Sequence, residues 1–319
     1  MHILPLTQSH IPEAAELFAA GFRRLRKSVP ALPEHMEDPA CAAGQLDVLL
    51  AHSAGIAAFS GGRMVGYLGW WLVDGFRGTQ RKAGYVPAWA HALAEPQDAA
   101  ALGMLYEAAA GAWYEAGCHA QAATLLADDP LTHRFWFWNN FGALVIDAVR
   151  PLTPLGIPQP QGMALRKATT ADAELVSMLE AEHWQHYSKP PVLMVANAAS
   201  GPAECAALLA DPANCFWLAF EKNEAMGYLR FEPTGEGSSE VLKGAGTIAC
   251  TGAYVRPRFR GRGAAPALLD AALRGFAEAG LQRCSVDFET FNPQASTFWM
   301  KYFTPVCLSV MRVPERSKA

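Results

Sequence analysis

The sequence is poor in the features that mark several large protein classes. Only 18% of its 319 residues are charged, whereas soluble domains usually carry about a quarter, so a large apolar core can be buried. No run approaches the roughly 18 consecutive apolar residues of a membrane span. The N-terminus lacks the basic start and apolar stretch of a secretory signal. The net charge of −4 lacks the basic excess of nucleic-acid-binding proteins. We therefore expect no membrane partner and no nucleic acid.

Patterned cysteines and nucleophile motifs are missing as well. The seven cysteines include no C-x-x-C pair, which argues against a disulfide framework and favours a reducing, cytoplasmic location. No G-x-S-x-G motif occurs and no Cys–His pair is recognisable, so covalent catalysis has no support. Glu182, His183 and His186 are close in sequence, but a metal site needs more ligands and a tighter signature. We expect no metal, and we expect these three residues to line the acceptor side of a cleft.

What the chain does contain is an internal repeat. Gly66-Tyr67-Leu68 recurs as Gly227-Tyr228-Leu229, and the Phe-Trp pair at 135–136 recurs at 298–299 with nearly the same spacing. An ordered series of such matches indicates a duplicated domain. Between the copies, residues 151–162 (PLTPLGIPQPQG) hold four prolines and no charge, the composition of a stiff, extended linker. We predict domains at 1–150 and 163–319, joined by this linker.

Each copy has the same expected order of elements: strand, helical region, hairpin, strand, helix, strand, helix, strand. Alternation of this kind favours an α/β arrangement of layers. In the second copy, Ala265, Leu269, Leu273 and Phe276 are three or four residues apart, which predicts one apolar helical stripe.

The copies differ most at residues 254–269 (YVRPRFRGRGAAPALL), because the first copy has no arginines or paired glycines there. A Gly-rich turn that opens a helix presents free backbone N–H groups, here from about 259 to 265, and the helix dipole favours an anion. Gly261 and Gly263 can adopt positive φ and admit a phosphate closely. Charge-assisted contacts are expected from Arg258, Arg260 and Arg262. Because only one copy has this turn, we predict that it binds phosphate.

The turn fits one known pattern. The Walker pattern is absent, and the dinucleotide pattern G-x-G-x-x-G fails because Pro266 occupies its third glycine position. The pattern [RQ]-x-x-G-x-[GA] is met by Arg258, Gly261 and Gly263, after a strand-like segment (TIACTGAYV) and before the periodic helix. In this context the sequence resembles the GNAT family of N-acetyltransferases, as a tandem pair with a degenerate first copy.

The resemblance implies a fold and a set of ligand-binding residues. Each copy would have a central mixed, mostly antiparallel sheet flanked by helices. The loop, together with Ala264, would bind the pyrophosphate of acetyl-CoA. The backbone of the splayed fourth strand at Ala253, Tyr254 and Val255 would bind the pantetheine arm. The family's later Asn and Ala match Asn292 and Ala295.

Two positions depart from the family. The Tyr that often serves as general acid is Trp299 here, and the first copy also has Trp at the matching position, so packing explains it better. The Glu that often serves as general base is Thr251. Asp287 and Glu289 are two residues apart on one strand and therefore share a face. We take Glu289 as the candidate base and Tyr302, one helical turn past Trp299, as the candidate acid.

The first hypothesis is therefore an acyl-CoA-dependent N-acyltransferase, with acetyl-CoA as co-substrate and direct transfer to an amine. The amine is expected on a small molecule or a peptide, and its identity is open, as is the oligomeric state. Two alternatives stay open: an acyl-CoA-binding sensor without activity, and an aminoacyl-tRNA-dependent transferase, which also pairs GNAT-like domains.

Overall fold

The computed structural model describes residues 1–95, 98–195, 198–233 and 238–315. The strands are β1 (His2–Pro5), β2 (Ala54–Ser60), β3 (Arg63–Val73), β4 (Ala83–Val86), β5 (His91–Leu93), β6 (Ala120–Leu126), β7 (Gly142–Pro151), β8 (Met163–Lys167), β9 (Cys215–Glu221), β10 (Glu224–Glu232), β11 (Thr247–Val255), β12 (Arg283–Glu289) and β13 (Thr304–Arg312). The α-helices are α1 (Ile11–Ser28), α2 (Pro39–His52), α3 (Ala99–Glu115), α4 (Pro130–Trp138), α5 (Ala173–Tyr187), α6 (Pro202–Ala210), α7 (Ala264–Glu278) and α8 (Pro293–Tyr302).

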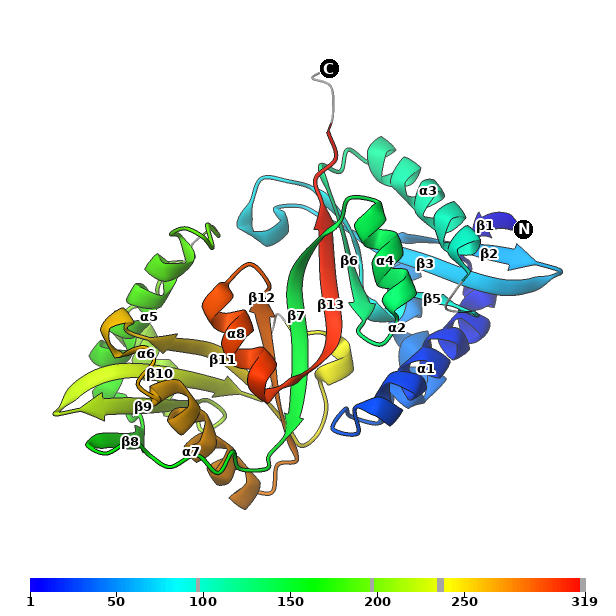
Figure 1. The fold of residues 1–319 in the computed structure, drawn as a ribbon. Coiled ribbons are helices and arrows are strands. Elements are labelled where there is room, and N and C mark those ends of the chain that lie inside the picture. The colour runs from blue at the N-terminus through cyan, green and yellow to red at the C-terminus, as the bar shows by residue number, and fades with distance from the viewer. Residues whose placement is uncertain (96–97, 196–197, 234–237, 316–319) are drawn as a thin grey trace.

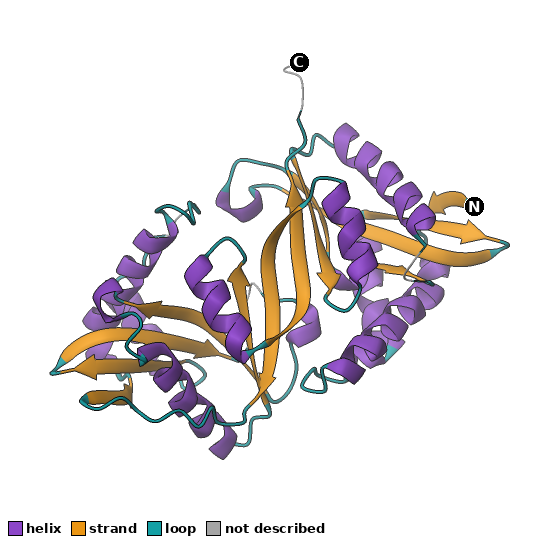
Figure 2. Ribbon diagram, viewed as in Figure 1, coloured by secondary structure: helices purple, strands orange, loops and turns teal. Residues whose placement is uncertain are grey.

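The strands join into one mixed sheet that runs through both halves of the chain. Its order is β1-β2-β3-β4-β6-β13-β7-β12-β11-β10-β9-β8, and β5 pairs with β3. The pairs β4–β6 and β11–β12 are parallel, and the other pairs among the described residues are antiparallel. Helices flank this sheet (Figure 1, Figure 2). The predicted α/β class and the mostly antiparallel mixed sheet are confirmed.

The halves exchange their last strands. β7 of the first half pairs with β12 and β13 of the second half, while β13 pairs with β6 and β7 of the first half. The two exchanged strands lie side by side at the centre of the molecule (Figure 1). Residues 152–162, between β7 and β8, contain no helix or strand. The division at 151–162 therefore follows the sequence repeat, while the sheet is continuous across it.

The helix after the arginine turn is α7, and its apolar stripe faces the sheet. Leu269 and Leu273 are fully buried, and Phe276 is 7% exposed. The ring of Phe276 packs edge-on against Phe231 of β10, with centroids 4.9 Å apart. Pro266 lies in the first turn of α7, where its missing N–H costs no helical hydrogen bond. Packing of this stripe fixes the start of α7 against the sheet.

Three further features concern the described residues as a whole. All seven cysteines are free thiols. No described helix has the length and apolar character needed to cross a membrane. In the part of the chain that the structure describes, no group of three or more His, Cys, Asp or Glu side chains is arranged to hold a metal ion.

Candidate active site

The site begins where β11 and β12 separate. Their parallel pairing extends from Thr247 opposite Arg283 to Cys250 opposite Val286. Beyond that point β11 continues to Val255 beside β10 only. A register shift in the β10–β11 pair leaves Thr251 without a partner in β10. The edge of residues 251–255 that faces β12 therefore has backbone N–H and C=O groups free to bind a ligand.

A cavity of about 640 Å³ opens at this separation, within the range of small-molecule sites, roughly 300–1,000 Å³. Its walls come from β10, β11, β12, α5, the first turn of α7 and the length of α8. The predicted residues that line it are Ala253, Tyr254, Val255, Arg260, Gly261, Gly263, Ala264, Asn292 and Tyr302. Arg258, Arg262 and Glu289 do not line it.

The loop before α7 has the predicted backbone conformation. Gly261 has φ of 72° and Gly263 has φ of 84°, so both need the left-handed region that glycine tolerates. The N–H groups of Phe259 and Arg260 already donate to backbone carbonyls, which narrows the predicted donors to residues 261–265. In the described part of the chain, the N–H groups of 261–263 find no acceptor. A Cβ at Gly261 would meet nothing within 4 Å.

The three loop arginines have different surroundings. Arg260 lines the cavity, and its Nε donates to the Val255 carbonyl at 2.9 Å. Arg258 and Arg262 instead form ion pairs on the β9–β10 hairpin, with Glu224 and Glu221 respectively. Their side chains are 61% and 48% exposed, and exposed pairs contribute at most about 1 kcal/mol. A bound polyanion can therefore compete for both arginines.

Thr251 presents a polar group that suits a ligand. It lines the cavity, and its Oγ1 is buried without a hydrogen-bond partner among the described residues. A buried hydroxyl left unpaired costs about 1–3 kcal/mol. The family's usual Glu would lie at this position, so the sequence identified the residue but not its unpaired hydroxyl.

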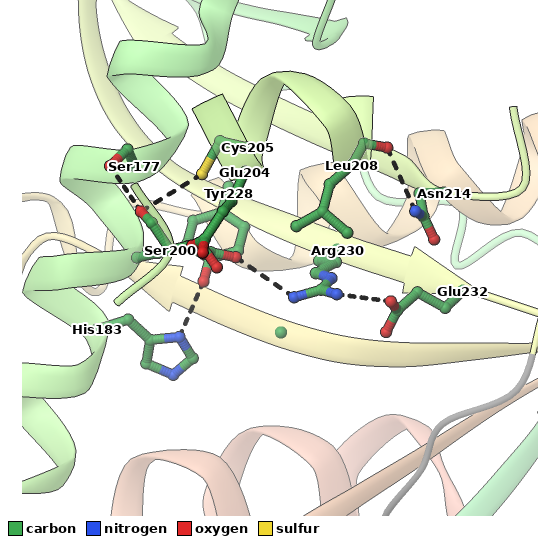
Figure 3. Close-up of polar contacts among 12 residues, drawn as sticks. Ser177, His183, Ser200, Glu204, Cys205, Leu208, Asn214, Tyr228, Arg230 and Glu232 are labelled. Carbon is green, nitrogen blue, oxygen red and sulfur yellow. Dashed lines mark hydrogen bonds and ion pairs between the residues drawn. The ribbon is translucent and has the colours of Figure 1, made fainter. Parts of the chain in front are cut away.

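Two of the three residues noted on α5 line the cavity. His183 and His186 do so, whereas Glu182 forms an ion pair with Arg256, Nη2 to Oε1, at 2.7 Å. His183 Nδ1 lies 3.0 Å from Tyr228 Oη (Figure 3). Burial lowers the pKa of His183 to about 3 and also lowers the pKa of His186. His183 is therefore uncharged at neutral pH.

The two carboxylates on β12, Asp287 and Glu289, have different surroundings. Asp287 lines the cavity, and Ser238 Oγ donates to its Oδ1 at 3.4 Å. Burial, and then the charge of Glu289, raise the pKa of Asp287 to about 6. Glu289 Oε1 accepts from Arg77 Nη2 at 3.2 Å, across the seam between the halves. The sequence identified Asp287 and Glu289 as candidates, and only the fold shows that Asp287 alone of the two lines the cavity.

Tyr302 and Trp299 both border the cavity but differ in burial. Trp299 is 3% exposed and packs edge-on against Phe298 and Phe303, with centroids 4.7 and 5.2 Å away. Trp136, its match in the first half, is fully buried. Within the described residues, the Tyr302 hydroxyl has no hydrogen-bond partner, so it is free to meet a ligand.

The equivalent place in the first half is closed. There β4 pairs with β6, but the chain then turns and β5 pairs with β3 instead. The cavity near it measures about 60 Å³, and His91 Nε2, in its wall, lies 2.8 Å from the Thr124 carbonyl oxygen. At the start of α3 the carboxylate of Asp98 accepts from Ala101 N at 2.9 Å. A protein carboxylate thus occupies the helix end that α7 leaves open.

Comparison with known proteins agrees with this geometry. Residues 176–303 match the acetyltransferase (GNAT) family; no curated protein matched the chain. The crystal structure of a GCN5-related N-acetyltransferase from Sphaerobacter thermophilus superposes with a TM-score of 0.57 at 13% identity, over 99% of this chain and 97% of that one. A GCN5-related glucosamine N-acetyltransferase region of a fungal multi-domain β-N-acetylglucosaminidase gives 0.52 at 13% identity, over 97% of this chain and 38% of that one. A tandem GNAT protein from the clavulanic acid biosynthesis pathway gives 0.49 at 16% identity, over 99% of each chain. The chain therefore has the fold of a GCN5-related N-acetyltransferase over nearly its whole length, and its residues 176–303 match the acetyltransferase (GNAT) family.

Proposed function

We propose that this protein is an acyl-CoA-dependent N-acyltransferase that transfers an acyl group, acetyl in the first instance, directly from CoA to an amine. The amine belongs to a small molecule or a peptide. The observation that carries the proposal is the open loop at 261–265, which begins α7 beside the separated end of β11.

The residues present suit an acyl-CoA. The free N–H groups of 261–265 and the N-terminus of α7 suit the pyrophosphate, and the space beside Gly261 lets it approach the backbone. Arg260 adds a cation to this end of the cavity. The unpaired edge of 251–255 suits the amide groups of the pantetheine arm, and the orphan Thr251 hydroxyl gains a partner. Among the described residues of the first half, β5 turns to β3 and Asp98 caps α3, so we assign CoA binding to the second half alone.

The transfer forms a bond from the amine nitrogen to the acyl carbon and breaks the bond from that carbon to sulfur. The amine arrives as an ammonium and first loses one proton; after attack its nitrogen loses a second, and the departing thiolate gains one. We assign the first to Asp287, which lines the cavity and with a pKa of about 6 is mostly ionised at pH 7. We assign the donation of a proton to the thiolate to Tyr302, whose hydroxyl has no hydrogen-bond partner among the residues that the structure describes and which regains a proton from the nitrogen's second loss. Glu289, the candidate from sequence, is the second candidate, because it does not line the cavity and pairs with Arg77.

The remaining contribution is geometric. The free N–H groups of β11 beside the acyl carbonyl stabilise charge that develops on its oxygen. Holding the thioester and the amine in one cavity supplies orientation. His183, buried and uncharged, bonds to Tyr228 and helps to hold α5 against the sheet, so it shapes the amine side of the cavity.

The second candidate function is an acyl-CoA sensor without activity. Trp299 and Thr251, at the positions of the family's usual acid and base, favour it. The aminoacyl-tRNA-dependent alternative is disfavoured by the net charge of −4, since binding to a polyanion relies on cationic surface.

The experiment has two steps. Titration with acetyl-CoA should raise the melting temperature, and CoA release should then be measured over a panel of amines. Binding with amine-dependent release supports the transferase. Binding without release on any amine supports the sensor, and failure to bind acetyl-CoA refutes both.

A further inference from the structure

A second cavity lies at the seam between the halves. It measures about 440 Å³, large enough for a small organic molecule. One wall is the first-half loop that includes Phe76, Arg77 and Arg81, and the opposite wall includes Trp184 on α5 and Phe291 after β12. The degenerate first half therefore supplies side chains to a cavity that the second half completes.

The seam cavity adjoins the acyl cavity. Trp184 lines the seam cavity, while His183 and Tyr187 of the same helix line the acyl cavity. Phe291 lines the seam cavity, and the next residue, Asn292, lines the acyl cavity. The two cavities are therefore neighbours along α5 and along the segment after β12.

The chemistry of the seam cavity is cationic and aromatic. Arg77 and Arg81 line it, and of the residues that the structure describes no carboxylate does; its other large side chains are aromatic or aliphatic. Within the described residues, the Arg81 guanidinium has no hydrogen bond or ion pair. Arg77 pairs with Glu289. An unpaired guanidinium beside aromatic rings favours an anionic group on an apolar body, because Arg binds carboxylates in a fixed fork geometry.

The loop that presents these arginines is held in an uncommon conformation. Arg77 has φ of 54° and ψ of 40°, and a non-glycine residue there costs about 1–3 kcal/mol. Gly78, next along, also has positive φ, at 70°. A Cβ built on Gly78 would lie 3.4 Å from Val195 Cγ1 in the opposite wall. The fold thus holds the Arg77 side chain in the seam at a cost in backbone strain.

From these features we propose that the acceptor is an amino acid with an aromatic or apolar side chain, whose carboxylate and side chain lie in the seam cavity and whose ammonium reaches Asp287 in the wall of the acyl cavity. This rests on the proposed transferase function. The Arg77–Glu289 pair is the charge complement of such a molecule: its ammonium meets the carboxylates of Glu289 and Asp287, and its carboxylate meets Arg77 and Arg81. The aromatic walls contact the side chain. Polyamines and aminoglycosides, which are polycations, are rejected by the two arginines.

The test compares phenylalanine with phenylalaninamide and 2-phenylethylamine, which lack the carboxylate. Wild-type protein should acetylate phenylalanine with the lowest KM of the three. Arg81→Gln should raise the KM for phenylalanine by roughly 10-fold or more, the range for losing a hydrogen bond to a charged group. It should leave the KM values for 2-phenylethylamine and acetyl-CoA unchanged. Arg63→Gln, at the exposed tip of the β2–β3 hairpin far from the seam (Figure 1), is the matched control and should change none of them.

Calorimetry with the same amines separates this inference from the proposed function. If acetyl-CoA binds but no amine is acetylated, the transferase proposal fails, while phenylalanine that binds wild type more tightly than Arg81→Gln still supports the amino-acid site. If wild type prefers spermidine or 2-phenylethylamine to phenylalanine, or if Arg81→Gln weakens all amines equally, the inference is overturned. A preference for phenylalaninamide over phenylalanine would point to peptide N-termini and would also overturn it.

Discussion

Asp147 and Asp287 are register partners across the exchanged strands β7 and β12, so one carboxylate from each half meets at the centre of the sheet. Asp147 is 2% exposed and accepts a hydrogen bond from Ser239 N at 2.8 Å. Burial, followed by the charge of Asp287, raises the pKa of Asp147 to about 7. Two buried carboxylates at such a position oppose one another's ionisation.

The first prediction concerns Asp147→Asn and stability. The folded pKa lies above the ordinary value of 3.8, so between about pH 4 and 7 the folded state binds more protons, and wild-type stability falls as pH rises. Asn cannot ionise but still accepts from Ser239 N. The variant should be more stable than wild type at pH 8, on the order of 2 kcal/mol, and the difference should shrink toward pH 4.

Urea unfolding at pH 4, 6 and 8 measures this. Asp47→Asn, exposed on α2, is the control and should show no such trend. A variant at Asp147 that is destabilised equally at every pH would mean that its role is confined to the hydrogen bond.

The second prediction concerns Gly261→Val. Its φ of 72° makes any side chain strained, and the space beside it is where we assign the pyrophosphate. Gly280→Val is matched to it, because Gly280 has φ of 82° and also nothing within 4 Å, yet it follows α7 at the far end from the loop. Both should lose about 1–2 kcal/mol of stability. Only Gly261→Val should lose affinity for acetyl-CoA, by 10-fold or more, as roughly one charge-assisted hydrogen bond is lost.

Calorimetric titration of acetyl-CoA distinguishes the two variants. Gly263 is less suitable, because a Cβ there would lie 3.0 Å from Pro160 Cγ and mix steric strain with loss of the anion site. Equal affinities for Gly261→Val and Gly280→Val would remove the loop from the binding site.

The third prediction uses the matched tryptophans. Trp299→Ala and Trp136→Ala each remove a buried ring, and each should cost about 3–5 kcal/mol of stability. Because the residue recurs in the half without the loop, the shared role is packing. In Trp299→Ala the free energy of unfolding should therefore fall by this amount, while turnover per folded molecule should change little. A stable Trp299→Ala that binds acetyl-CoA but has selectively lost turnover would instead give the ring a place against substrate.

The sequence predicted the turn before α7 and its positive-φ glycines because these depend on local chemistry. The sequence alone shows the glycine pair, the proline in the first helical turn, and the arginines that only one copy contains. The tandem fold followed for the same reason, since repeated short motifs retain their spacing.

The strand exchange was not predictable in this way. β7 and β13 have the same place in their repeats, and no local pattern says whether a strand pairs within its own half or with the other. The directions of Arg258 and Arg262 depend on Glu221 and Glu224 at the tip of a distant hairpin. The choice between Asp287 and Glu289 depends on Arg77, which lies more than 200 residues earlier. Each is a long-range contact that only the folded chain defines.

The last prediction distinguishes these two carboxylates as proton acceptors. Asp287 must be ionised to accept a proton, and its pKa of about 6 means that turnover should rise with pH through 6 and level off above it. Asp287→Asn should lower kcat at pH 7 by about 10²-fold or more, the range for lost general-base catalysis, and should lose this rise. The deficit should shrink at high pH, where the amine deprotonates unaided.

Glu289→Gln is the matched comparison, because its charge is one cause of the raised pKa of Asp287. Removing that charge should move the rise in turnover to lower pH while kcat at pH 8 stays near wild type. Because Glu289→Gln also releases Arg77 from its ion pair, the KM for the amine can change, and kcat is therefore the quantity that decides. The affinity for acetyl-CoA should be unaltered in both variants. If instead Glu289→Gln loses 100-fold in kcat and Asp287→Asn retains activity, the proton acceptor is Glu289, and the ion pair with Arg77 must open when the amine binds.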